Sequence, residues 1–112
     1  MSESQDLGAV IARLVATIQT RKGAPPSGSY TASLLAEGPA KAAKKFGEEA
    51  VELALAAASE SDERVAAEAA DVIYHLLVLL AARGVDVSAV AAALAAREGR
   101  SGHAEKAARK ND

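Results

Sequence analysis

The sequence predicts an all-α protein, in which an antiparallel helical hairpin with flanking helices assembles into a helical-bundle dimer. Half of the 112 residues are hydrophobic, alanine supplies most of these, and only 3% of the chain is aromatic. Small side chains favour closely packed helices over sheets, which prefer β-branched and aromatic residues. We expect a single domain over residues 1–112, with a loosely held tail from about residue 100. A domain this small buries little surface, which favours a homodimer.

The first predicted helix is amphipathic and ends near the sequence TRKG at 20–23. The segment APPSGS at 24–29 follows, and its two prolines and glycine predict a loop. The helix is predicted from apolar residues that recur at helical spacing, namely Leu7, Val10, Ile11, Leu14, Val15 and Ile18.

Two helices are predicted to follow the loop. Ser29 or Thr31 caps a short helix, which Gly38 ends because glycine readily adopts the left-handed conformation. A longer helix over about residues 39–58 begins with a proline, whose fixed φ suits the first turn and whose missing N–H is not needed there. Gly47 lies inside this helix although its propensity is poor, and a glycine there permits the close approach of a neighbouring backbone or a ligand.

A polar turn and two further helices complete the predicted fold. The segment at 59–62 is rich in capping residues and predicts a tight turn. The next helix covers about residues 63–83 and ends at a glycine. Asp86 or Ser88 then caps a last helix over residues 89–97.

The charge and composition of the chain exclude several classes of partner and site. The net charge is −2 with mixed signs, so neither a nucleic acid nor a membrane surface is an expected partner. Cysteine is absent, which excludes a disulfide and a thiolate metal site. The amino-terminal sequence MSESQDLGAV does not resemble a secretory signal, and the apolar run at 72–82 is too short to span a bilayer. We therefore expect a soluble, cytoplasmic protein.

Two pairs of acidic residues occur at helical spacing in the Ala-rich segments, Glu49 with Glu52 and Glu68 with Asp71. Residues three apart share one helix face. The inner acids, Glu52 and Glu68, are each eight positions from Glu60, and the outer acids are each eleven. A hairpin that turns at Glu60 therefore places all four carboxylates at matching heights, where they either converge or form a solvated acidic face.

Converging carboxylates repel one another unless a cation lies between them. At an effective dielectric constant of about 20, two unit charges about 5 Å apart repel by about 3 kcal/mol. Hard oxygen ligands select Mg²⁺ or Mn²⁺, and an incomplete carboxylate cage leaves water molecules that a phosphate can replace. We therefore expect a Mg²⁺ site, with Mn²⁺ as the alternative ion, that serves a phosphorylated substrate and is formed by Glu49, Glu52, Glu68 and Asp71.

Basic residues are available for the other half of a phosphate site. Lys41 and Lys45 lie eight and four positions ahead of Glu49, which places the three residues along one helix face. Arg21 precedes the predicted loop and either adds positive charge from another segment or stabilises the end of the first helix. Glu48 lies one residue off the acidic face, where it acts on a water molecule or a second metal, or else forms a surface ion pair with Lys44.

Several segments resemble one family. They are SYTASLLAEG at 29–38, KKFGEEAVELALAA at 44–57, EAADVIYHLLVLL at 68–80 and LAAREGRSGHAEKAAR at 94–109. In this order they closely resemble the phosphoribosyl-ATP pyrophosphatase family of histidine biosynthesis. The wider MazG-like all-α nucleotide pyrophosphohydrolases share the pattern ExxE followed by ExxD, which the two acidic pairs match.

The resemblance implies a MazG-like fold and the Mg²⁺-dependent hydrolysis of phosphoribosyl-ATP to phosphoribosyl-AMP and pyrophosphate. It implies that the four acids bind the metal, that Lys45 matches the lysine before the GEE motif, and that residues 29–31 form the family's SYT segment, namely Ser29, Tyr30 and Thr31. Bound Mg²⁺ would orient the triphosphate and activate a water molecule, and Glu48 or Glu49 would accept its proton. Since little sequence precedes the first helix, we expect a form without a fused cyclohydrolase domain.

Three other functions are compatible with parts of the pattern. A MazG-like house-cleaning enzyme would hydrolyse another nucleoside triphosphate with the same metal ligands. A di-iron bundle would need Glu-x-x-His motifs, whereas the motifs here end in Glu52 and Asp71. A non-enzymatic helical interaction module would carry the acids as a solvated face and would not respond to Mg²⁺.

Overall fold

The computed structural model describes residues 5–99 together with Gly102, Lys106 and Arg109. Apart from these three positions, the predicted tail lies outside the described residues. The described part is helical and contains no strand, so the prediction of an all-α fold is confirmed. Its elements are α1 (Leu7–Arg21), the 3₁₀ turn η1 (Pro26–Gly28), α2 (Tyr30–Glu37), α3 (Pro39–Ser59), α4 (Asp62–Arg83) and α5 (Val87–Ala95).

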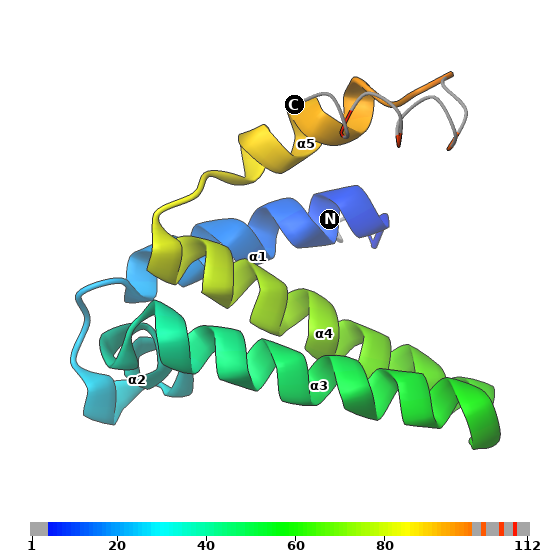
Figure 1. The fold of residues 1–112 in the computed structure, drawn as a ribbon. Coiled ribbons are helices and arrows are strands. Elements are labelled where there is room, and N and C mark those ends of the chain that lie inside the picture. Colours follow the sequence, from blue (N-terminus) through cyan, green and yellow to red (C-terminus); the bar gives the residue numbers. More distant parts are fainter. Residues whose placement is uncertain (1–4, 100–101, 103–105, 107–108, 110–112) are drawn as a thin grey trace.

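Helices α3 and α4 pack against each other as the predicted antiparallel hairpin (Figure 1). Glu60 and Ser61 form the turn between them. The Ser61 hydroxyl caps α4 by accepting a hydrogen bond from the backbone N–H of Arg64 at 3.3 Å. Two acidic residues in the first turn of α4 further stabilise this end, because the helix dipole is positive there.

Local side-chain hydrogen bonds decide where two other helices begin. Ser29, rather than Thr31, caps α2, since its hydroxyl accepts a hydrogen bond at 3.2 Å from the backbone N–H three residues later. Asp86, rather than Ser88, caps α5, so this helix begins at Val87, two residues earlier than predicted. The capping chemistry was therefore predicted correctly, whereas the choice between neighbouring caps was not determined.

The glycines and prolines agree only in part with the predictions. Gly84 has a φ of 78° and ends α4 in the left-handed conformation, as predicted. The described part of the chain does not use the close approach that Gly47 permits, because a Cβ there would meet no atom within 4 Å. The predicted loop at 24–29 contains the short turn η1, which begins at a proline.

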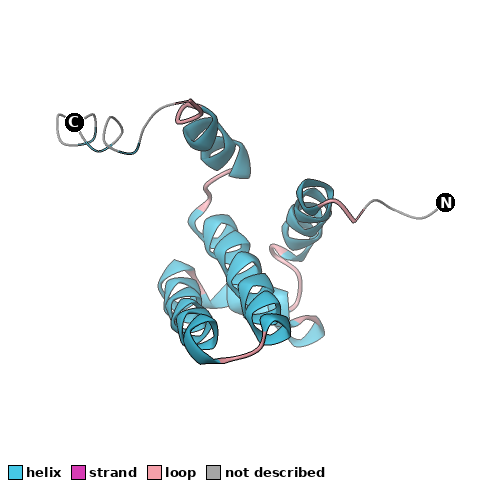
Figure 2. Cartoon of the chain, turned by 90° about the vertical axis from the view of Figure 1, so that its right-hand side faces the viewer, coloured by secondary structure: helices cyan, strands magenta, loops and turns pink. Residues whose placement is uncertain are grey.

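The core lies where helices α1 to α4 meet. It has one buried residue each from α1, α2 and α3 and three from the carboxyl-terminal half of α4, namely Ile18, Leu34, Ala42, Leu77, Val78 and Ala81. Complete burial of a side chain such as Ile18 contributes about 1.5–3 kcal/mol relative to exposure. By contrast, α5 has no buried residue and lies away from the hairpin in both views (Figure 1, Figure 2).

Helix α4 is the one helix in the described part of the chain that is long and apolar enough to cross a membrane. The apolar run at 72–82 is too short to span a bilayer by itself, whereas the whole helix meets the criteria of length and composition. A core helix of a soluble protein meets the same criterion, and α4 packs against α1, α2 and α3. Only 28% of its apolar window is buried within the chain, so much of its apolar surface is left without a partner.

Candidate functional site

Three of the predicted metal ligands come together across the α3–α4 hairpin. Glu49 of α3 and Glu68 and Asp71 of α4 each present a carboxylate oxygen, and these oxygens all lie within 4.8 Å of one another. The antiparallel pairing explains this convergence, because positions equally distant from the turn lie opposite each other. We refer to Glu49, Glu68 and Asp71 as the acidic cluster.

The acidic cluster extends from the protein interior to the solvent. Glu68 is buried, with 7% of its surface exposed, whereas Glu49 is half-buried and Asp71 is exposed. Oε1 of Glu68 accepts a hydrogen bond from Arg64, but Oε2 is buried and has no partner. A buried oxygen without a partner is costly, so Oε2 marks a position where a cation or a donor would stabilise the protein.

Glu52 lies beside the acidic cluster rather than within it. This side chain is exposed and shares a hydrogen bond with Glu49. Burial, the hydrogen bond with Glu52 and the nearby negative charges of Glu52 and Asp71 together raise the pKa of Glu49 above its ordinary value of 4.5, against an opposing effect of His75. A bound cation would act against this shift, because a nearby positive charge favours the charged form of a carboxyl group. The role of Glu52 as a ligand stays a prediction.

Two aromatic residues of α4 support the cluster from the next helical turn. His75 is buried, and its Nδ1 lies 2.9 Å from the backbone carbonyl oxygen of Asp71, to which it donates when Nδ1 carries the proton. Its Nε2 is buried without a partner. The Tyr74 ring packs edge-on against the imidazole, with the ring centroids 4.9 Å apart. Both residues therefore stiffen the segment of α4 that carries Asp71.

The Tyr74 hydroxyl also connects this segment of α4 to α2. It lies 2.5 Å from the hydroxyl oxygen of Thr31 and forms a hydrogen bond with it. Of the other predicted substrate residues, Ser29 uses its hydroxyl as the α2 cap, and Tyr30 is 58% exposed. The segment at 29–31 is thus fixed relative to the acidic cluster through Thr31.

The predicted basic residues remain at the surface. Lys45 forms an ion pair with Glu48, with Nζ and Oε1 3.7 Å apart, so Glu48 is paired with Lys45 rather than with Lys44. Lys41 is exposed one helical turn earlier. Arg21 donates a hydrogen bond to the Thr20 hydroxyl at 3.4 Å, and no contact in the described part of the chain connects it to the acidic cluster.

Arg64 is the residue of this site that the sequence reasoning missed. It forms ion pairs with two acids, Glu60 in the hairpin turn four positions before it and Glu68 on α4 four positions after it. This spacing was the available signal, since residues four apart are neighbours on a helix. Because such pairs are common on solvated helices, the signal became informative only when Glu68 proved to be buried.

Comparison with known proteins identifies the family. A family model described as phosphoribosyl-ATP pyrophosphohydrolase matches residues 11–98. The chain belongs to this family. This match confirms the resemblance that was inferred from the sequence motifs.

Curated relatives of this family member cover nearly its whole length. A protein of Cereibacter sphaeroides (strain ATCC 17029 / ATH 2.4.9) is 60% identical over 100 residues, which are 89% of this chain and 97% of the relative. A protein of Caulobacter vibrioides (strain NA1000 / CB15N) is 58% identical over 106 residues, which are 95% and 98% of the two chains. Both relatives are named phosphoribosyl-ATP pyrophosphatase.

The acidic cluster has a set of ligand atoms that suits a Mg²⁺ ion. Its donors are hard carboxylate oxygens from three residues, and they are close enough to bind one ion. Oε2 of Glu68 is an oxygen ligand to which no protein group donates a hydrogen bond. The exposed side at Asp71 leaves room for water molecules or phosphate oxygens in the remaining positions. The residues present therefore fit the ion predicted from the sequence.

Proposed function

We propose that this chain hydrolyses phosphoribosyl-ATP to phosphoribosyl-AMP and pyrophosphate, the second step of histidine biosynthesis, in a Mg²⁺-dependent reaction. The observation that carries the proposal is the convergence of three carboxylates within 4.8 Å in a chain of this family. The name of the Cereibacter relative, at 60% identity, supports the choice of substrate over an ordinary nucleoside triphosphate.

The acidic cluster would bind the metal through Glu49, Glu68 and Asp71, and Glu52 would join them by a change of side-chain rotamer. When bound, Mg²⁺ neutralises phosphate charge and makes a water molecule more acidic. The hairpin contributes rigidity, because ligands on two packed helices hold their positions better than ligands on a loop.

Glu49 is the better placed of the two candidate proton acceptors. It lies among the acids, and its pKa is raised by burial and by its acidic neighbours. Glu48 is exposed and paired with Lys45, which places it at the border of the cluster. We assign Glu48 to the orientation of Lys45 and assign Lys45 to the phosphates of the substrate, with Lys41 adding positive charge one turn away. Arg21 stays a candidate for the same role from α1.

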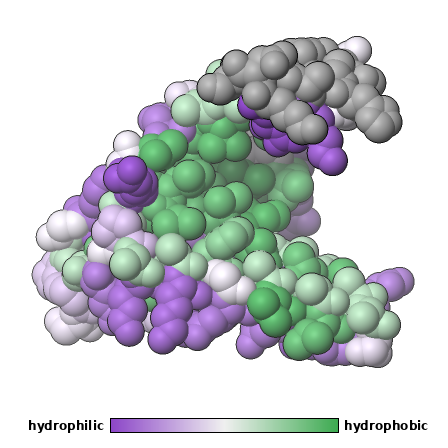
Figure 3. All heavy atoms as spheres, viewed as in Figure 1, coloured by the Kyte–Doolittle hydropathy of each residue, from purple (hydrophilic) through white to green (hydrophobic). Residues whose placement is uncertain are grey.

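We also propose that the protein is a homodimer. Leu7, Leu55 and Leu94 are each about three-fifths exposed although they are large and apolar. Apolar side chains gather over α1 and α4 on the concave face beside α5 (Figure 3). Apolar surface of this extent is typical of an interface. A second copy would cover it and would supply the packing that α5 lacks within the chain.

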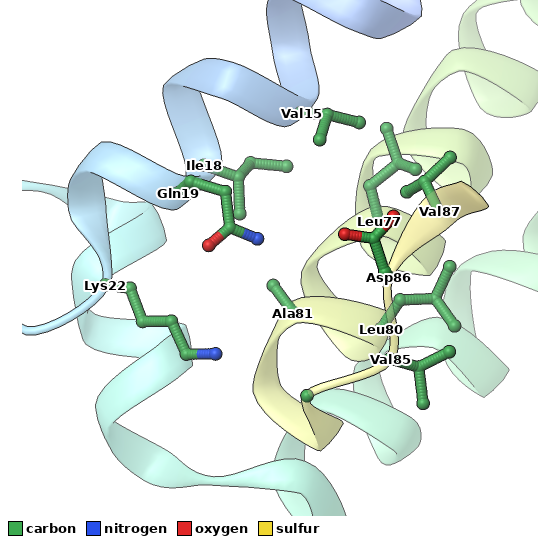
Figure 4. A pocket seen from close by; sticks show the side chains of 11 residues that line it. Val15, Ile18, Gln19, Lys22, Leu77, Leu80, Ala81, Val85, Asp86 and Val87 are labelled. Atoms are coloured by element: carbon green, nitrogen blue, oxygen red, sulfur yellow. The ribbon is translucent and has the colours of Figure 1, made fainter. Parts of the chain in front are cut away.

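A cavity adjoins α1, α4 and the connection to α5. It has a volume of about 250 Å³ and lies between the end of α1 and the connection from α4 to α5 (Figure 4). Apolar side chains such as Ile18 and Leu77 form its wall, and Gln19, Lys22 and Asp86 add polar groups. Leu77 lies six residues beyond Asp71 on α4, about 9 Å along the helix axis, so the cavity is separate from the acidic cluster.

The proposed reaction agrees with a soluble, cytoplasmic enzyme. The buried polar groups of α4, Glu68 and His75, would be costly to place among lipid chains. The relatives are named phosphoribosyl-ATP pyrophosphatase. We therefore interpret the apolar surface of α4 as a protein interface.

The test is the release of pyrophosphate from phosphoribosyl-ATP by the purified chain, with Mg²⁺ and with a chelator. We expect hydrolysis with Mg²⁺ alone, and a Glu49→Gln variant serves as the matched control for contaminating activity. Hydrolysis of ordinary or modified nucleoside triphosphates in preference to phosphoribosyl-ATP would favour the house-cleaning alternative. Absence of all hydrolysis, with no effect of Mg²⁺ on the melting temperature, would reject both enzymes.

A further inference from the structure

Arg64 holds the buried member of the acidic cluster. Its Nη2 donates a hydrogen bond to Oε1 of Glu68, and its Nε donates to Oε1 of Glu60 at 3.4 Å. The two ends of the first pair differ in exposure: 57% of the Arg64 side chain is accessible to solvent, against 9% of the Glu68 side chain. The guanidinium group therefore brings positive charge from the surface to a carboxylate that lies in the interior.

The same carboxylate belongs to the proposed metal site. Oε1 of Glu68 bonds to Arg64, while Oε2 is buried with no partner, and Glu49 and Asp71 each have an oxygen within 4.8 Å of a Glu68 oxygen. A divalent ion at this position would face the positive charge of the guanidinium across one carboxylate group. Like charges at such a distance repel, so the ion and Arg64 cannot both interact optimally with Glu68.

We propose that Arg64 is an exchangeable counter-ion of the acidic cluster: it neutralises Glu68 when the site holds no divalent ion and is displaced toward solvent when one binds. This inference rests on the proposed Mg²⁺ site but not on the identity of the nucleotide substrate. Two observations make the exchange feasible. Arg64 is a surface side chain with open solvent to move into, and it keeps a second acidic partner in Glu60 after it leaves Glu68.

The proposal assigns Arg64 two opposing effects. In the metal-free protein it stabilises the fold, because Glu68 would otherwise be a buried charge without a partner. In the presence of Mg²⁺ it weakens metal binding, because part of the binding free energy is used to separate Arg64 from Glu68. Removing the charge should therefore lower the stability of the metal-free protein and strengthen metal binding at the same time.

The experiment compares Arg64→Gln with Arg83→Gln in the full chain. Both substitutions remove one positive charge from an exposed position of α4, but Arg83 lies in the last turn of the helix, far from the cluster. Mg²⁺ alone is titrated calorimetrically, and thermal melts are recorded with and without Mg²⁺. For Arg64→Gln we expect the Kd for Mg²⁺ to fall roughly three- to ten-fold, as for the loss of one partly exposed charge. We expect a lower metal-free melting temperature for this variant and an unchanged Kd for Arg83→Gln.

A third variant distinguishes charge from shape. Arg64→Lys keeps the positive charge, so its Kd should stay close to that of the parent, and a Kd as low as that of Arg64→Gln would overturn the counter-ion role. An unchanged or higher Kd in Arg64→Gln, with the parent binding Mg²⁺ normally, would also overturn it while leaving the proposed function intact. A parent chain that does not bind Mg²⁺ at all would instead reject the proposed metal site, and this inference with it.

Discussion

The hydroxyl oxygens of Thr31 and Tyr74 lie 2.5 Å apart, although 43 positions separate the two residues in the chain. Their hydrogen bond joins the first turn of α2 to α4, three residues beyond Asp71. Because Tyr74 also packs against His75, which bonds to the Asp71 backbone, the proposed substrate segment and the acidic cluster share one support. The proposed substrate segment and the proposed metal ligands are therefore mechanically connected through Tyr74.

This connection predicts the effect of Tyr74→Phe. The variant loses the hydrogen bond but keeps the ring, so the free energy of unfolding should fall by about 1 kcal/mol. The KM for phosphoribosyl-ATP should rise more than kcat falls, because the metal ligands themselves are unchanged. A double-mutant cycle with Thr31→Val, measured by denaturant unfolding and by kinetics, checks both effects. Additive losses in the cycle would show that the two hydroxyls do not interact.

Amide variants test the shared metal site. Glu49→Gln, Glu68→Gln and Asp71→Asn should each reduce hydrolysis by at least about 100-fold, since each loses an anionic ligand. We expect the same direction for Glu52→Gln. The rise in melting temperature on addition of Mg²⁺ should shrink in all four variants. Full activity in any two of them would contradict a shared site.

The metal-free stabilities of two of these variants should differ. Asp71→Asn relieves repulsion in the empty cluster, so this variant should melt at or above the temperature of the parent. Glu68→Gln also removes the charge that pairs with Arg64, and this loss offsets the relief. Thermal melts in chelator should therefore rank Asp71→Asn above Glu68→Gln, and the opposite order would argue against the observed pairing of Arg64.

Lys45→Ala tests phosphate recognition. The side chain is partly exposed and contributes an ion pair with Glu48 but no core packing, so the helix content should not change. We expect a rise in KM or a fall in kcat of about ten-fold, as for the loss of one charge-assisted phosphate contact. Lys44→Ala is the control, because it removes the same charge from the adjacent position. Equal kinetics for the two variants would show that Lys45 does not bind phosphate and serves only in its surface ion pair with Glu48.

The apolar surface beside α5 predicts association of two chains. Leu94→Glu places a charge on a side chain that is 58% exposed, so it should leave the monomer fold intact and weaken the dimer. Ser59→Glu, at the end of α3 next to the hairpin turn, is the control. Sedimentation equilibrium at micromolar concentration should show a dimer for the parent and the control, with dissociation for Leu94→Glu. An active parent monomer at this concentration would disprove the dimer.

The cap of α5 predicts a specific pH dependence. Hydrogen bonds from the side chain and backbone of Ser88 lower the pKa of Asp86 below its ordinary value of 3.8. The carboxylate form therefore stabilises the helix fully above the unfolded pKa, and this contribution is lost as the pH falls through the lower folded pKa. The ¹³Cα chemical shifts of α5 should show this loss in the parent but not in Asp86→Asn, which keeps a capping oxygen and does not titrate. Identical titration of the two proteins would contradict the assignment.

Much of the fold could be predicted because the signals for it are local. Ser29, Ser61 and Asp86 cap helices through hydrogen bonds to backbone N–H groups two or three residues away, and Gly84 ends α4 by its own conformation. The spacing of the acids about Glu60 likewise determined which residues stand opposite each other once the hairpin closed. These features depend on backbone geometry and sequence separation alone, so the amino-acid sequence by itself specified them.

Only the tertiary structure decided how the helices are rotated about their own axes. That rotation is set by core packing, in which Ala42 and Ala56 are the buried residues of α3. It places Glu68 inside and leaves Glu52 in solvent, although the two stand at equal distance from the turn. The same rotation brings Arg64 to the buried Glu68 and Tyr74 to Thr31. This rotation depends on many contacts between segments that are far apart in the sequence, so a local sequence pattern does not determine it.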